Sequence, residues 1–345
     1  MYHANTAQPL APADIPFRIH ADRPLALLRQ CPAYAPTPLR QVAWEGPNPL
    51  WVKDETTRMG LGSFKALGGA FAVAQMICDR SGLPDPTTAG DVAGAMTFIT
   101  ASAGNHGLSV AAGAQVFGAT AKIVLSASVP EAFANRIRAK GADVIRIDGS
   151  YEDSVAEAAK LAAENGWIHL ADGSWEGYTE APALVMEGYT VLAEECRQAF
   201  DISGQFSDHV LLQAGVGGLA AAVAGHIRCF WPKQPRITVV EPDAAPCLLR
   251  SVQAGTLTHA GGPVSNMGRL DCKDASLLAF ETLRRAADDF ITVTDAQAAE
   301  AAARMTAMGI ATTPSGAAAL AALPLLDLPA EAGIMIIASE GSEGD

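Results

Sequence analysis

The chain has 345 residues, of which 49% are hydrophobic, 18% are charged and 6% are aromatic. This length supports one large domain or two medium domains with a buried core. The formal net charge of −13 argues against nucleic acid as a partner, because binding to phosphates needs clustered lysine and arginine side chains.

The N-terminal segment and the cysteines predict a cytosolic protein that does not cross a membrane. Residues 1–24 hold prolines and charges rather than a basic start followed by an apolar run, so we expect no signal peptide. No run of 18 uninterrupted apolar residues occurs, and we therefore expect no transmembrane helix. The six cysteines form no C-x-x-C pair and have no histidine at zinc-like spacing, which predicts reduced thiols and no metal site.

Short β-rich runs alternate with longer alanine-rich segments along the chain. We predict buried strands at residues 95–100, 121–125, 143–147, 209–213, 236–241 and 333–338. We predict helices at residues 106–117, 130–140, 154–165, 181–200, 219–229 and 295–308. This alternation indicates parallel βαβ units and an α/β fold, with one series over about 67–168 and a second from about 171 onward.

Lys65 follows a glycine-containing turn and precedes an apolar, helix-forming segment. Burial and the positive end of a helix both disfavour an ammonium group, so we expect this lysine to lose its proton more easily than an exposed one. A neutral lysine is the nucleophile that forms a Schiff base with an aldehyde cofactor. The alternative interpretation is a surface lysine in the first turn of a helix.

Two other turns join a predicted strand to a predicted helix. Residues 102–107 read S-A-G-N-H-G, where backbone N–H groups can bind a carboxylate and the Asn105 amide can donate to a phenolic oxygen. Residues 213–220 read Q-A-G-V-G-G-L-A, and their glycines let the backbone approach a phosphate at a helix N-terminus. This second pattern is neither G-x-G-x-x-G nor a Walker motif, which favours a single phosphate over a dinucleotide. Ordinary βα turns are the alternative for both.

Several polar residues lie near predicted strand ends. Asp172 can act as an acid, a base or a clamp for a substrate ammonium, or it can form an Asx-turn with Gly173. Ser339 ends the last predicted strand and otherwise belongs to a polar tail. We expect His106 to stabilise its turn, and His169 and His209 to be core residues.

Taken together, these segments resemble the fold type II pyridoxal-phosphate (PLP) enzymes. That family includes threonine and serine dehydratases, cysteine synthases and diaminopropionate ammonia-lyases. The resemblance covers roughly residues 34–342 and implies a two-domain α/β fold of parallel sheets with flanking helices. It places residues 1–66 and 171–345 in a large PLP-binding domain and residues 67–170 in a small mobile domain, and it implies a homodimer.

The resemblance also implies roles for individual residues. Catalytic roles fall to Lys65 and Asp172, with Lys65 as the natural base for an L-substrate. Cofactor contacts are implied for Phe64, Lys65, Asn105, Gly215, Val216, Gly217, Gly218, Leu219 and Ser339. Contacts with the substrate carboxylate are implied for Ser102, Ala103, Gly104, Asn105 and His106. A hydroxyl beside the pyridine nitrogen, as at Ser339, favours loss of a β-leaving group.

Three segments are similar to diaminopropionate ammonia-lyases in particular. These are residues 172–178 (D-G-S-W-E-G-Y), the E-P and A-P-C residues within 241–247, and residues 266–273 (N-M-G-R-L-D-C-K). Position 103 departs from the subfamily, which has an aspartate there that serves as the base for the D-isomer. Because a methyl group cannot take a proton, Ala103 argues against activity on a D-substrate by that route.

The implied reaction is a PLP-dependent α,β-elimination on a β-substituted L-amino acid, giving a 2-oxo acid and ammonia. Serine or threonine dehydration, β-replacement as in cysteine synthase, and racemisation are alternatives, and the missing second base weakens racemisation. A non-catalytic ligand-binding protein on the same fold is a further alternative, although it would not need a Schiff-base lysine. The small-molecule substrate is expected to be an amino acid, whose identity the sequence leaves open.

Overall fold

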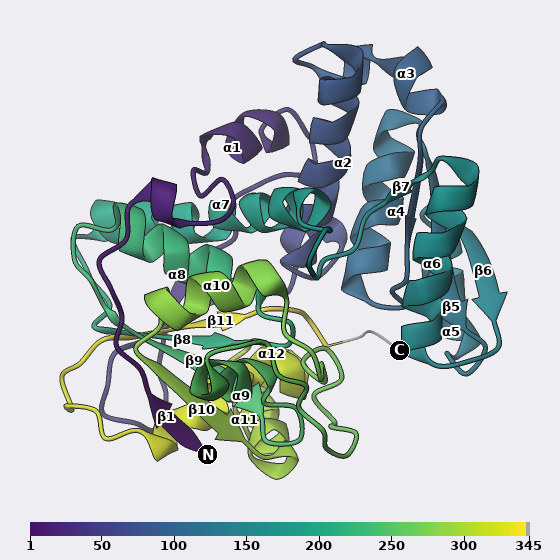
Figure 1. Cartoon of the computed structure of the whole chain (residues 1–345). Helices are drawn as coiled ribbons and strands as arrows, with labels where there is room; N and C mark the ends of the chain where they lie inside the picture. The colour runs from purple at the N-terminus through teal and green to yellow at the C-terminus, as the bar shows by residue number, and fades with distance from the viewer. Residues whose placement is uncertain (343–345) are drawn as a thin grey trace.

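The computed structural model describes residues 1–342, which form two β-sheets flanked by helices (Figure 1). In spatial order, the larger sheet consists of β1 (Tyr2–Ala4), β10 (Asp289–Val293), β9 (Arg236–Pro242), β8 (His209–Gln213), β11 (Ile334–Ala338), β3 (Leu50–Asp54) and β2 (Leu39–Val42). Its five inner strands are parallel, and the two edge strands pair antiparallel with their neighbours. Strands β3, β8, β10 and β11 are buried throughout, as expected for parallel strands covered on both faces.

The smaller sheet is wholly parallel and lies within residues 97–169. In spatial order it consists of β6 (Asp143–Ile147), β5 (Thr120–Ser126), β4 (Thr97–Thr100) and β7 (Ile168–His169). Figure 1 shows this sheet with its helices to one side of the larger sheet. The movement of residues 67–170 as a separate domain stays a prediction.

The helices occupy the segments between the strands. The α-helices are α1 (Asp22–Leu28), α2 (Lys65–Ser81), α3 (Gly90–Gly94), α4 (Asn105–Phe117), α5 (Glu131–Arg138), α6 (Tyr151–Asn165), α7 (Glu180–Ser203), α8 (Gly218–Phe230), α9 (Cys247–Ala254), α10 (Leu277–Ala286), α11 (Asp295–Ala307) and α12 (Pro314–Ala322). Short 3₁₀ turns lie at Pro12–Asp14, Arg58–Gly60, Pro86–Thr88 and Leu323–Leu325. None of the helices described is both long enough and apolar enough to cross a membrane.

Helix α2, which begins at Lys65, is fixed by close contact with α7. A Cβ added at Gly188 would lie 2.6 Å from the carbonyl oxygen of Leu67, and one at Gly68 would lie 2.4 Å from the Tyr189 ring. Only glycine permits this approach of the two backbones. Gly68 and Gly188 thus fix the distance between α2 and α7, and with it the position of Lys65 at the start of α2.

The predicted α/β class is confirmed, and the six predicted strands and six predicted helices all occur with small shifts at their ends. The prediction missed strand β3, whose sequence L-W-V-K-D ends in two charged residues. Both are nevertheless buried, and each has a charged partner: Lys53 pairs with Glu195 of α7, and Asp54 pairs with Arg40 of β2. Strands β1, β2, β7 and β10 were also missed, and β1, β2 and β7 have only two to four residues each.

Candidate active site

The side chains of Lys65 and Asp172 form an ion pair between Nζ and Oδ2. Lys65 is the first residue of α2, and Asp172 lies in the loop between β7 and α7. Both side chains retain some exposure, 21% and 24% respectively, so the pair borders a solvent-accessible space. The Asx-turn interpretation of Asp172 is not needed, since its carboxylate faces Lys65.

The charges of this pair depend on each other. Burial disfavours the ammonium of Lys65, but the Asp172 carboxylate outweighs this effect and raises the pKa of Lys65. Burial likewise opposes ionisation of Asp172, but the Lys65 ammonium lowers the pKa of Asp172 below its ordinary value. The expectation that Lys65 loses its proton easily is therefore wrong for this arrangement. A nucleophilic Lys65 must first give up a proton, and the ionised Asp172 carboxylate opposes that loss.

Two aromatic rings lie beside the Lys65 ammonium. The Nζ atom is 5.3 Å from the centre of the Phe64 ring and 5.7 Å from that of Tyr189. The two rings meet edge to face, with their centres 4.9 Å apart. The Tyr189 hydroxyl is buried and has no hydrogen-bond partner within residues 1–342. A buried hydroxyl without a partner is costly, and it marks a place where a polar ligand atom can bind.

The turn at residues 102–107 connects β4 to α4, as predicted. The Ser102 hydroxyl accepts a hydrogen bond from the Gly104 N–H at 3.3 Å, and Asn105 begins the helix. Ala103 is partly buried and packs against the core. His106 is buried, with Nε2 2.8 Å from the carbonyl oxygen of Leu170, so it ties this turn to the segment that carries Asp172. This contact agrees with the expected structural role.

The glycine-rich turn after β8 leads into the N-terminus of α8. Gly217 has φ of +99°, a conformation that favours glycine, and α8 begins at Gly218. A Cβ added at Gly215 would lie 3.0 Å from both the Arg269 carbonyl oxygen and Cys272 Sγ, so a larger residue would be tightly crowded there. The first N–H groups of a helix have no partner within it, and here they are available to an anion. Val216 is partly buried and Leu219 is buried.

Ser339 follows the last residue of β11 and is buried. Its carbonyl oxygen accepts a hydrogen bond from the Phe64 N–H at 3.1 Å, which holds the Lys65 segment against the end of β11. The next residue, Glu340, was not predicted as a site residue. Its carboxylate contacts Asn105 and lies 3.5 Å from Arg269 Nε. An acidic residue at the carboxyl end of a buried parallel strand was a signal for it in the sequence.

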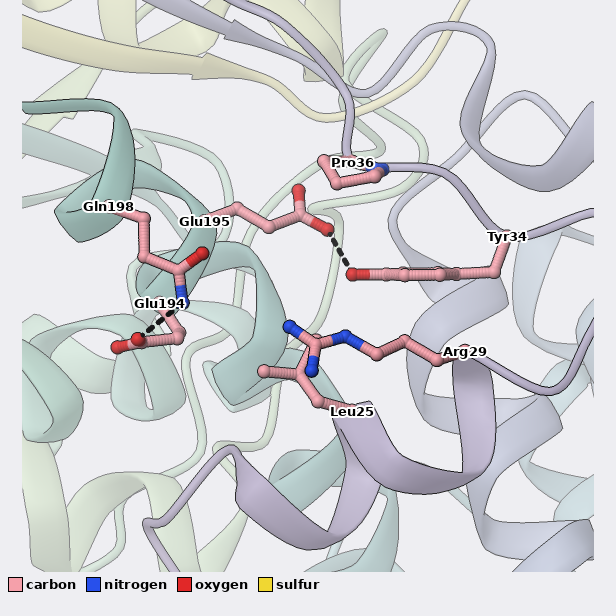
Figure 2. Close-up of a pocket in the computed structure, with 7 residues that line it drawn as sticks. All are labelled: Leu25, Arg29, Tyr34, Pro36, Glu194, Glu195 and Gln198. Carbon is pink, nitrogen blue, oxygen red and sulfur yellow. Dashed lines mark hydrogen bonds between the residues drawn. The ribbon is translucent and has the colours of Figure 1, made fainter. Parts of the chain in front are cut away.

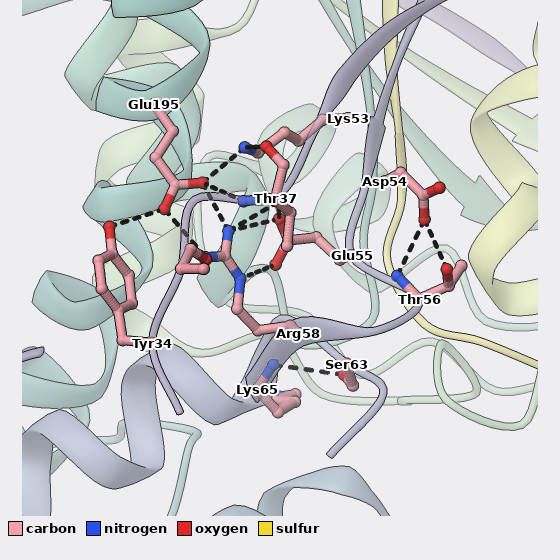
Figure 3. A network of polar contacts seen from close by, with 11 residues as sticks. Tyr34, Thr37, Lys53, Asp54, Glu55, Thr56, Arg58, Ser63, Lys65 and Glu195 are labelled. Atoms are coloured by element: carbon pink, nitrogen blue, oxygen red, sulfur yellow. Dashed lines mark hydrogen bonds and ion pairs between the residues drawn. The ribbon is translucent and has the colours of Figure 1, made fainter. Parts of the chain in front are cut away.

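A buried charge network precedes Lys65 in the chain (Figure 3). Arg58 contacts Glu55 and Glu195, each at 2.7 Å, and Lys53 Nζ lies 2.5 Å from Glu195. The Tyr34 hydroxyl donates to the same Glu195 at 2.9 Å. The network joins the N-terminal arm, β3 and α7, and it supports the turn that leads into Lys65.

A surface hollow of about 270 Å³ opens beside this network (Figure 2). Its lining residues are Leu25, Arg29, Tyr34, Pro36, Glu194, Glu195 and Gln198. None of the candidate site residues lines this hollow, so we do not assign the substrate to it.

The other two histidines singled out in the sequence lie at strands, but within residues 1–342 neither His169 Nε2 nor His209 Nδ1 has a hydrogen-bond partner, so neither is a satisfied core histidine. His209 is buried within β8. His169 ends β7, and burial lowers the pKa of His169 to about 4. Within the described residues, the hydrogen bond and ion pair of Lys65 and Asp172 involve neither histidine.

With this geometry established, comparison with known proteins identifies the family. Residues 31–340 match the family model described as pyridoxal-phosphate dependent enzyme. Diaminopropionate ammonia-lyase of Escherichia coli (strain K12) is 37% identical over 277 residues, which cover 77% of this chain and 70% of that protein. The crystal structure of the Escherichia coli enzyme in complex with an aminoacrylate-PLP azomethine reaction intermediate has a TM-score of 0.87 at 31% identity, covering 99% of this chain and 94% of that chain. The processed form of threonine deaminase isoform 2 from Solanum lycopersicum has the same fold, with a TM-score of 0.80 at 20% identity over 100% of this chain and 89% of that one. The chain therefore belongs to the family of pyridoxal-phosphate dependent enzymes.

Proposed function

We propose that this protein is an ammonia-lyase, similar to diaminopropionate ammonia-lyase, that converts a β-substituted L-amino acid to a 2-oxo acid and ammonia. The observation that carries the proposal is the ion pair of Lys65 with Asp172 beside both predicted anion-binding turns. A Cβ added at Gly218 would lie 3.9 Å from the Asp172 carbonyl oxygen, and His106 contacts Leu170 in the same segment. The nearness of Lys65 and Asp172 to both glycine-containing turns supports the proposal.

The residues present fit PLP. The N-terminus of α8 with Gly215, Gly217 and Gly218 suits its phosphate, and Lys65 is the amine that attaches its aldehyde. The Asn105 amide would hold its ring hydroxyl, and the Ser339 hydroxyl would face its ring nitrogen. PLP then supplies an electron-withdrawing ring that stabilises negative charge at the substrate's α-carbon.

The chain's own groups bind the substrate and move its protons. N–H groups of the turn at 102–105 hold the substrate carboxylate, and they stabilise charge without having to reorganise. Lys65 Nζ, once neutral, takes the α-proton, and the Asp172 carboxylate compensates the ammonium that forms. The methyl group of Ala103 offers no base on the opposite side, so this arrangement favours an L-substrate and disfavours racemisation.

The leaving group is not decided by these contacts. An amine gives a diaminopropionate-type reaction, and a hydroxyl gives a serine- or threonine-type dehydration. Cysteine synthase-like β-replacement needs a second nucleophile, so product analysis with and without a thiol separates it from elimination. That the protein is a cytosolic homodimer also stays a prediction, and light scattering of the purified protein tests the dimer.

Lys65→Ala tests the proposal directly. We expect the variant to lose the visible absorbance band of bound PLP and to release no 2-oxo acid from serine, threonine, hydroxyaspartate, phenylserine or diaminopropionate. The matched control is Lys160→Ala, which removes an exposed helix lysine paired with Glu157 and leaves both the band and turnover unchanged. Normal turnover by Lys65→Ala would refute the assigned role.

A further inference from the structure

Glu340 is a buried acid at the point where the two sheet regions of the molecule meet. It is 4% exposed and directly follows Ser339 at the end of β11. Its backbone forms an isolated antiparallel bridge with Ser63, two residues before Lys65. The acid is thus fixed beside the candidate site by the main chain as well as by its side chain.

Both oxygens of the Glu340 carboxylate receive donors. The Thr313 hydroxyl donates to Oε1 at 2.6 Å, and the Asn105 amide donates through Nδ2 to Oε2. Arg269 Nε lies 3.5 Å from Oε2. The Glu340 carbonyl oxygen also accepts a hydrogen bond from the Thr312 hydroxyl at 2.5 Å. These donors come from the loop before α12, from α4, and from the loop that packs on Gly215.

The contact with Asn105 has a chemical consequence for the amide. An ionised carboxylate only accepts hydrogen bonds, so it selects the orientation in which the NH₂ group of Asn105, rather than its carbonyl oxygen, faces Glu340. An amide nitrogen carries two N–H donors, so the second N–H remains to serve another acceptor. Without the carboxylate, nothing in this contact distinguishes the two amide orientations.

We propose that Glu340 is a positioning residue, which orients the Asn105 amide so that an N–H group faces the oxygen of the PLP ring hydroxyl. This inference rests on the function proposed above, in which Asn105 contacts that oxygen. Glu340 itself touches neither substrate nor PLP in this proposal. It acts through Asn105, and it links α4 of the smaller sheet region to β11 of the larger sheet.

Glu340→Gln tests the proposal, because the glutamine keeps the shape but can donate as well as accept. We expect PLP, titrated into apoprotein and followed by its visible absorbance, to bind about tenfold to a hundredfold more weakly, as for loss of a hydrogen bond that a charged group maintains. Glu340→Asp keeps the charge and should recover part of the affinity. If Glu340→Gln binds PLP as tightly as the unmodified protein, the proposal is wrong.

A double-mutant cycle separates positioning from a general loss of stability. If Glu340 acts through Asn105, then Glu340→Gln should have little further effect on PLP affinity in an Asn105→Ala background. Glu187→Gln is the matched control: Glu187 is also buried and paired with arginine, but on α7 with Arg23 and Arg18. The effect of Glu187→Gln on PLP affinity should be small, and it should add to the effect of Asn105→Ala. Full additivity of Glu340→Gln with Asn105→Ala would overturn the proposal.

The two proposals fail in different ways. If Lys65→Ala keeps the PLP band, the proposed function is wrong whatever Glu340 does. If Lys65→Ala loses the band while the cycle shows no coupling between Glu340 and Asn105, only the positioning role is wrong. Melting temperatures of all variants identify any that do not fold. If Glu340→Gln does not fold, the PLP affinity of Glu340→Asp is measured in its place.

Discussion

Lys65 and Asp172 are 107 positions apart in the chain, yet their charged atoms are in contact. The pair explains how a partly buried lysine keeps a compensated positive charge. The carboxylate raises the pKa of Lys65, and in the proposed reaction it compensates the charge that Lys65 carries after taking the substrate proton. In the proposed reaction Asp172 therefore acts together with Lys65.

Asp172→Asn should separate these two effects. Without the carboxylate the pKa of Lys65 falls. The pH profile of the rate at which PLP attaches to apoprotein should therefore shift to lower pH. We expect kcat to fall by about 100-fold or more, because the partner in proton transfer is lost. Stopped-flow absorbance and steady-state 2-oxo acid release measure the two quantities. Asp327→Asn, in the exposed loop before β11, is the control. A kcat within twofold of normal would contradict a role for Asp172 in proton transfer.

At the scale of elements, the site is assembled from the ends of strands and the starts of helices. The turn before α4, the turn before α8 and the end of β11 each contribute residues, and the segment into α2 contributes Lys65. The network of Arg58 with Glu55, Glu195 and Lys53 fixes that last segment against α7. Every charge in it is buried, so its members depend on one another for compensation.

Arg58→Ala should therefore be strongly destabilising. It leaves Glu55 and Glu195 buried with Lys53 as the remaining cation, at a cost of about 3–5 kcal/mol in the free energy of unfolding. Urea denaturation followed by circular dichroism measures this change. Arg138→Ala, which breaks an exposed ion pair with Glu131, should cost less than about 1 kcal/mol. Equal losses for the two variants would show that the network does not hold the fold together.

For the whole molecule, buried titratable groups make stability depend on pH in two opposite ways. Burial lowers the pKa of four histidines, so the unfolded chain binds more protons than the folded protein below about pH 6.5. Their contribution to stability is lost as the pH falls below that value. These histidines are His106, His169, His209 and His226.

Glu241 has the opposite effect at higher pH. Burial raises the pKa of Glu241 to about 8, although the N–H groups of Leu248 and Leu249 donate to its carboxylate. The folded protein then holds a proton that the unfolded chain releases above about pH 4.3, so stability declines until about pH 8. We expect the free energy of unfolding to be greatest near pH 6.5 and to fall from there to pH 8. In Glu241→Gln this fall should disappear in urea titrations at each pH, and its persistence would contradict the assignment.

The sequence by itself determined the features that depend on neighbouring residues. Glycines at 215, 217 and 218 after an apolar strand predict the turn that begins α8, and the place of Lys65 at the start of an apolar helix follows from its own segment. The α/β class follows from the alternation of apolar strands with alanine-rich helices, and the family from the combination of these motifs.

Only the tertiary structure determined which charged side chains are in contact. The strand β3 was missed because its lysine looks exposed until Glu195 of α7 is placed beside it. The raised pKa of Lys65, and the contacts of Glu340 with Asn105 and Arg269, likewise join segments that are distant in the chain. Electrostatic effects depend on distance and burial, and neither can be read from residue order, so these properties appear only when the two sheets bring the segments together.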